Sequence, residues 1–237
     1  MDKIKKALEV NGKYWIAFVG DSITSTEWVH PNWREIVEYV LKDKLQNDFS
    51  NWRIPSWGIR CFNWGFDGAT TKDILEKIDA IIAMKPNFVI SLMGGNDPTL
   101  GLKPEETKNN IEKIFENLKQ NDINVFWMTT TPDLNGKKDR EYSEFSKVAL
   151  SINTSDGQTV FDMFEEYKKY DLKRFFTFIS EGNEAEHIKA GEIDPDHPNQ
   201  LGNAYIAKVI LKQVFGIDFD PEKYIKTTVE GYKYPEY

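Results

Sequence analysis

Two segments near opposite ends of the 237-residue chain carry a serine and a histidine in settings suited to nucleophilic catalysis. Gly20-Asp21-Ser22 ends the apolar run at residues 14–19, which predicts a serine exposed on a tight turn between a strand and a helix. A helix N-terminus at that turn favours developing negative charge. Asp194 stands three residues before His197, where its carboxylate can accept a hydrogen bond from the imidazole and fix its tautomer. The serine segment alone fits an ordinary turn or helix cap equally well.

Two further segments combine glycines with groups that can donate hydrogen bonds. Residues 63–71 contain Gly65 and Gly68, and glycines let a backbone N–H approach a ligand closely. Gly94-Gly95-Asn96-Asp97 follows another apolar run, and a side-chain amide held on such a turn can donate to an oxyanion. A turn followed by a helix cap is the plainer interpretation of both segments.

A metal site is the alternative use of the histidine segment. Asp194, Asp196 and His197 are its candidate ligands, although no second histidine stands at ligand spacing. The same Asp196 leaves open which aspartate orients the imidazole. Cys61 is the only cysteine, which excludes an internal disulfide and a multi-thiolate metal site.

Several side chains near these segments are candidates for lining a substrate pocket. Asp21 and Asp97 adjoin Ser22 and Asn96 in the sequence, and His30 follows the serine turn shortly afterwards. Four tryptophans fall in the loops around the first two segments, at positions 28, 52, 57 and 64. Tryptophans can stack on a sugar ring or hold an acyl chain, but covering the core is the favoured interpretation for most of them. We therefore expect a pocket formed by Asp21, Trp64, Asp97 and His30.

Alternating strands and helices must position these residues. Short apolar runs predict strands at residues 14–19, 59–62, 87–93, 125–128 and 159–161, and helical spacing predicts helices at 33–45, 71–82, 111–118, 142–152 and 205–215. Such alternation favours parallel crossovers and a sheet covered on both faces, which is a three-layer α/β/α sandwich. Ligands bind such sheets at the carboxyl ends of the strands, next to the chemistry-bearing segments.

Length and charge limit the domain organisation and the partners. We expect one domain at residues 1–217 and an extension at 218–237, packed on the same domain or on a neighbouring subunit of a homo-oligomer. The net charge of −8, with scattered lysines, argues against a nucleic-acid partner. No apolar run approaches the roughly 20 residues that cross a bilayer, and no secretory signal is visible. We expect no membrane association and a cytoplasmic location.

In their order, the four segments resemble the blocks of the GDSL/SGNH hydrolase family over about residues 14–212. Gly20-Asp21-Ser22-Ile23 is similar to the nucleophile block, with Ile23 where the family name has Leu. By spacing from Asn63, Gly68 rather than Gly65 corresponds to the glycine donor. Two departures stand out: Ala69 follows Gly68 where the family often has a polar residue, and Pro195 follows Asp194 where glycine is frequent.

The resemblance implies a flavodoxin-like fold and a site for a serine mechanism. Ser22 would be the nucleophile and His197 the general base, oriented by Asp194. The oxyanion hole would be formed by the N–H groups of Ser22 and Gly68 and by the Asn96 amide. No metal or organic cofactor is implied.

The activity implied is hydrolysis of a carboxylic ester through an acyl-enzyme. The family includes lipases, thioesterases, arylesterases and carbohydrate acetyl esterases. The nearby tryptophans favour a short acyl or acetyl group on a small ester, carbohydrate esters included. The alternatives are a thioesterase or lipase-type acylhydrolase, a metal-dependent phosphoesterase, and a non-catalytic ligand-binding protein on the same fold.

Overall fold

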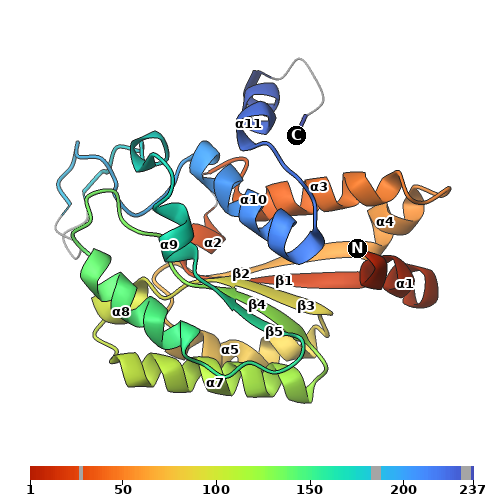
Figure 1. The fold of residues 1–237 in the computed structure, drawn as a ribbon, viewed down its shortest axis with the longest axis horizontal. Coiled ribbons are helices and arrows are strands. Elements are labelled where there is room, and N and C mark those ends of the chain that lie inside the picture. Colours follow the sequence, from red (N-terminus) through yellow and green to blue (C-terminus); the bar gives the residue numbers. More distant parts are fainter. Residues whose placement is uncertain (27–28, 183–187, 231–235) are drawn as a thin grey trace.

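A single parallel sheet forms the centre of the protein (Figure 1). The computed structural model describes residues 1–26, 29–182, 188–230 and 236–237. Within these residues five strands pair in the order β2-β1-β3-β4-β5, all parallel. Their bounds are β1 (Tyr14–Gly20), β2 (Ile59–Gly65), β3 (Phe88–Leu92), β4 (Asn124–Met128) and β5 (Gln158–Phe161). The five predicted strands are confirmed.

Helices cover both faces of the sheet, which confirms the three-layer α/β/α sandwich (Figure 1). One face carries α1 (Asp2–Asn11), α3 (Trp33–Gln46), α9 (Met163–Tyr167) and α10 (Gln200–Phe215). The other carries α5 (Thr71–Ala83), α7 (Pro104–Gln120) and the end of α8 (Asp139–Leu150). Short helical turns complete the chain: α2 (Ser22–Ser25), α4 (Arg53–Gly58), α6 (Asn96–Thr99) and a 3-10 turn at Leu172–Arg174.

The strand β1 is apolar because both of its faces are buried. On β1, Ile16 and Phe18 point to the α3 and α10 side, whereas Ala17 and Val19 point to the α5 and α7 side. A strand buried in this way cannot alternate apolar with polar residues. The resulting run ends at Gly20, where the chain leaves the sheet.

Of the helices with ten or more residues in the described part of the chain, α1 and α11 (Pro221–Glu230) were not expected from the sequence. The described part of the 218–237 segment packs on the same domain: the Tyr224 ring lies 6.1 Å from that of Tyr39 on α3. Phe219 is buried and its ring stacks on Tyr237 at 5.9 Å. Among the helices the structure describes, none is long and apolar enough to span a membrane.

Candidate active site

The serine turn lies where the strand order reverses, between β1 and β3. In sheets with the order 2-1-3-4-5, ligands bind beside this point. Gly20 is required there because a Cβ would collide with the Thr24 side chain and with the Leu92 carbonyl of β3. Ser22 begins α2, and Asp21 caps that helix by accepting a hydrogen bond from the Ile23 amide at 3.1 Å. The turn therefore holds Ser22 at the carboxyl edge of the sheet.

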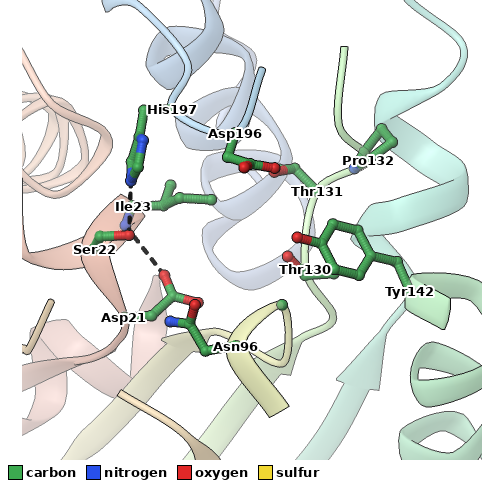
Figure 2. Close-up of a pocket in the computed structure, with 11 residues that line it drawn as sticks. Asp21, Ser22, Ile23, Asn96, Thr130, Thr131, Pro132, Tyr142, Asp196 and His197 are labelled. Carbon is green, nitrogen blue, oxygen red and sulfur yellow. Dashed lines mark hydrogen bonds between the residues drawn. The ribbon is translucent and has the colours of Figure 1, made fainter. Parts of the chain in front are cut away.

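The structure brings Ser22, His197 and Asp194 together in one hydrogen-bonded chain, and Figure 2 shows the Ser22–His197 part of it. His197 Nε2 lies 2.8 Å from Ser22 Oγ, and His197 Nδ1 lies 2.8 Å from Asp194 Oδ2. The other carboxylate oxygen of Asp194 accepts from the backbone amides of Asp196 and His197, at 2.9 and 3.1 Å. Of the two aspartates, Asp194 is the one whose carboxylate is hydrogen-bonded to the imidazole.

The charges of this chain shift its pKa values in opposite directions. Burial alone would lower the pKa of His197, but the hydrogen bond to Asp194 and nearby carboxylates outweigh it, so the pKa is raised. Burial alone would raise the pKa of Asp194, but hydrogen bonds from His197 and the backbone hold it below its usual value. Burial raises the pKa of Asp21 to about 7, although the hydrogen bond from the Ile23 amide and the charge of His197 oppose the shift. Asp194 is therefore ionised at neutral pH, where it favours a protonated imidazole.

The turn at residues 194–198, which carries His197, is called the histidine turn. Two asparagines hold it against the serine side of the site. Asn199 caps α10 by accepting from the Gly202 amide at 3.0 Å. Asn203, one turn further, is buried; it donates to the Pro198 carbonyl at 2.8 Å and accepts from the Trp33 amide at 3.1 Å. Because Trp33 begins α3, this bridge joins the start of α3 to the turn that carries His197. Asn203 was not predicted from the sequence, where its only signal is a polar residue on an apolar helix face.

Asn96 and the glycine segment meet beside Ser22. The Asn96 side-chain amide donates to the Ala69 carbonyl at 3.1 Å, which leaves its second N–H for another acceptor. Gly68, the residue before Ala69, has a φ of 70°, a left-handed conformation that favours glycine. Gly65 is also required, because a Cβ there would collide with the backbone at Ser25.

Asp97 has a structural position rather than the predicted place in the pocket. Its carboxylate is fully buried and accepts from the amide of Thr71 at 2.8 Å and from the hydroxyls of Thr71 and Thr107. Burial raises the pKa of Asp97, and the threonine hydrogen bonds oppose that shift. Asp97 thus ties the start of α5, just after Gly68, to the turn that carries Asn96.

A small cavity of about 30 Å³ opens beside Ser22. Figure 2 shows His197 on one side of Ser22 and Asn96 on the other, with a polar wall opposite. The residues that line the cavity come from the turns after β1, β3 and β4, from α8 and from the histidine turn: Asp21, Ser22, Ile23, Gly95, Asn96, Thr130, Thr131, Pro132, Tyr142, Asp196 and His197. Of the predicted pocket residues, only Asp21 is among them.

The predicted pocket residues Trp64 and His30 lie elsewhere. Trp64 packs on Phe66, and its indole N–H lies 2.7 Å from the Met84 sulfur. His30 is exposed, with its ring 3.2 Å from the Glu35 carboxylate. The expectation that most tryptophans cover the core is wrong for those at positions 52 and 57, which are 56% and 62% exposed. The tryptophan at position 28 lies outside the described residues.

The candidate metal ligands have other partners. Asp194 contacts His197, whereas Asp196 forms an ion pair with Lys138 at 2.8 Å. Within the described part of the chain, no group of three or more His, Cys, Asp or Glu side chains is placed to hold a metal ion.

The cavity wall formed by Thr130, Thr131 and Tyr142 was missed from the sequence. A signal was present for the threonines, because they directly follow β4 as Ser22 follows β1. No comparable signal was present for the Lys138–Asp196 pair, whose members are 58 residues apart.

Solved structures with the same fold include esterases and acylhydrolases. A lipase/acylhydrolase from Enterococcus faecalis is 19% identical, with a TM-score of 0.63 over 86% of this chain and 96% of that one. A catalytic mutant of Axe2, an acetylxylan esterase from Geobacillus stearothermophilus, is 19% identical, with a TM-score of 0.61 over 84% and 93%. TesA is 18% identical, with a TM-score of 0.57 over 83% and 95%. A comparison with curated protein sequences found no significant match.

The family model of the GDSL-like lipase/acylhydrolases matches residues 18–205, a span that begins on β1 and ends on α10. This span contains all four segments with which the sequence resembled the family. The chain therefore belongs to the GDSL-like lipase/acylhydrolase family and is an ester hydrolase.

Proposed function

We propose that the chain is a serine esterase that removes a short acyl group, such as acetyl, from a small ester, with Ser22 as its nucleophile. The observation that carries this proposal is the hydrogen bond of 2.8 Å between Ser22 Oγ and His197 Nε2, continued to Asp194. A nucleophile bonded to a base, which is in turn oriented by a third group, is the arrangement that activates a serine hydroxyl.

In the first step Ser22 Oγ attacks the carbonyl carbon and its proton passes to His197 Nε2. Asp194 accepts from Nδ1–H, so Nε2 is the nitrogen without a proton when the imidazole is neutral, and the same carboxylate stabilises the imidazolium after the attack. The imidazolium then gives its proton to the departing alcohol. Water, activated by the same imidazole, releases the acid from the acyl-enzyme.

The negative charge on the carbonyl oxygen needs donors that are already in place. We assign this role to the backbone N–H groups of Ser22 and Gly68 and to the second N–H of Asn96. Ser22 begins a helix, so its amide is among those that have no acceptor in the preceding turn. One such donor contributes about 3 kcal/mol to transition-state stabilisation.

The size of the cavity favours a short acyl group. A cavity needs about 10–15 Å³ to hold one water molecule, so about 30 Å³ suits a methyl group better than an alkyl chain. The polar wall adds to this preference, because an alkyl chain cannot form hydrogen bonds with the threonine hydroxyls or with the Asp196 carboxylate. The likeness to an acetylxylan esterase supports acetylated carbohydrates as one substrate class.

Hydrolysis of p-nitrophenyl acetate, butyrate and octanoate, with and without EDTA, tests the proposal. We expect the acetate to be hydrolysed with the highest kcat/KM and the octanoate with the lowest, and we expect EDTA to have no effect. Ser22→Ala and His197→Ala should each lower kcat by several orders of magnitude. A fluorophosphonate should label the wild type and not Ser22→Ala.

Ser151→Ala and His30→Ala are the matched controls, because both side chains lie on the surface away from the cavity. They should keep wild-type activity. Activity that persists in Ser22→Ala and falls with EDTA would instead support a metal-dependent hydrolase. A folded protein with neither turnover nor labelling of Ser22 would support a ligand-binding role.

A further inference from the structure

One oxygen of the Asp196 carboxylate has no assigned partner. The side chain is 13% exposed, and its Oδ2 lies 2.8 Å from Lys138 Nζ. Its Oδ1 is buried, and no donor among the described residues lies within hydrogen-bonding distance of it. Buried carboxylate oxygens normally accept hydrogen bonds, so Asp196 has an unmet acceptor, which a rotation about its Cβ–Cγ bond can turn toward a donor from outside the chain.

Asp196 lines the same cavity as Ser22. Figure 2 shows its side chain extending from the histidine turn toward Thr131, away from the hydrogen bond between Ser22 and His197. A group that enters the cavity to react with Ser22 therefore comes close to Asp196. The neighbouring wall, formed by Thr130, Thr131 and Tyr142, is also polar.

The position of the carboxylate is fixed by the loop that carries Lys138. Asp133 is buried in this loop and accepts from the backbone amides of Asn135 and Lys138, both within 2.8 Å. The Leu134 amide donates to the Pro195 carbonyl at 2.9 Å, which joins the loop to the histidine turn. The turn that carries Asp196 is therefore held in place before a ligand arrives, and only the carboxylate has to rotate to meet it.

The charge of Asp196 favours a neutral donor over a cation. Lys138 already compensates the carboxylate charge through Oδ2, so an ammonium group at Oδ1 would add an excess positive charge in a half-buried site. A hydroxyl group supplies the missing donor without adding charge. Sugars, polyols and hydroxy acids carry such groups.

We propose that Asp196 binds substrate by accepting a hydrogen bond from a hydroxyl group of the ester, and so selects hydroxylated esters over alkyl esters of the same size. The proposal rests on the proposed function, because it takes the cavity beside Ser22 as the place where the ester binds. The hydroxyl belongs either to the alcohol portion or to the acyl portion of the ester.

Two pairs of esters with equal numbers of non-hydrogen atoms distinguish these portions. The pair 2-hydroxyethyl acetate and propyl acetate places the hydroxyl on the alcohol side. The pair methyl 3-hydroxybutyrate and methyl 3-methylbutyrate places it on the acyl side. The kcat/KM of each ester is measured by titration of the released acid and divided by its rate constant for alkaline hydrolysis, which removes differences in intrinsic reactivity.

In the wild type we expect the hydroxylated member of one pair to be preferred by about tenfold or more, the value of a hydrogen bond to a charged group. Leucine has the branched shape of aspartate without its oxygens, and Lys138→Met avoids leaving a buried charge behind. The double variant Asp196→Leu with Lys138→Met should therefore lose the preference. Asp196→Asn keeps one carbonyl oxygen and should retain part of it.

The comparison of the two esters of a pair also controls for indirect effects on catalysis. The charge of Asp196 contributes to the raised pKa of His197, so its removal alters the rate with every substrate. The ratio within a pair cancels this change because both esters use the same base. A wild type without preference in either pair overturns the proposal, as does a preference that survives in the double variant. Activity that persists in Ser22→Ala overturns the proposed function as well.

Discussion

Replacing Asp97 tests whether a buried carboxylate holds together the two turns proposed to stabilise the oxyanion. Asp97 accepts from the Thr71 amide and from the hydroxyls of Thr71 and Thr107, and no part of it is exposed. Asp97→Ala removes the acceptor for all of these donors. The Thr71 N–H cannot turn to another acceptor, because it belongs to the first turn of α5.

The magnitude follows from these contacts. A buried N–H without an acceptor costs about 1–3 kcal/mol, and the lost hydroxyl hydrogen bonds and the cavity raise the total to about 3–5 kcal/mol. Asp97→Asn keeps the oxygen that faces the Thr71 amide, and its NH₂ can donate to the rotating hydroxyls. The asparagine variant should therefore lose less than about 2 kcal/mol.

Urea unfolding measures both variants. With a slope near 2–3 kcal/mol/M, Asp97→Ala should lower the midpoint by roughly 1–2 M, and Asp97→Asn by less than half of that. The alanine variant should also lose kcat with p-nitrophenyl acetate under conditions where it is fully folded, because Asn96 and Gly68 shift. A midpoint within about 0.3 M of the wild type would refute the reasoning.

Three further substitutions test other parts of the site. Asn96→Ala should lower kcat by about 10²–10³-fold with little change in KM; a change confined to KM would contradict the assigned role. Wild-type kcat/KM should rise with pH as His197 loses its proton, with a midpoint above the usual histidine value because its pKa is raised. Asp194→Asn should shift that midpoint to lower pH, since burial then acts without the carboxylate charge, and should lower kcat by about 10⁴-fold; an unchanged pH profile would contradict this. Gly65→Ala should unfold at lower urea than the wild type, because its Cβ meets the backbone at Ser25, and an equal midpoint would show that the turn can yield.

The strands and main helices were predictable because burial leaves a clear pattern. β1 is buried on both faces, so its apolar run could hardly be interpreted otherwise. The helix α11 was missed because its buried positions include Pro221 and Thr227 as well as Tyr224. These positions repeat with helical spacing, but proline and threonine are not among the apolar residues from which a buried helix face is predicted.

Sequence order located the proposed catalytic residues better than it located the pocket. Ser22 and His197 stand in motifs whose spacing fixes their surroundings. Asp97 is adjacent to Asn96 in the chain, yet its side chain points to Thr71 instead of the cavity. Adjacency does not give side-chain direction, and the ion pair of Asp196 with Lys138 depends on two loops that only the folded chain brings together.

The hydrogen bond between Ser22 and His197 joins residues 175 positions apart, which has a consequence for protein synthesis. The last strand ends at Phe161, so a ribosome releases all five strands before it releases the histidine. A nascent chain can then build the complete sheet while the proposed nucleophile, Ser22, is still without its proposed base. If Ser22 and His197 act as proposed, ester hydrolysis begins only when α10 has emerged and docked on α3, so activity reports that the chain has been synthesised through that helix.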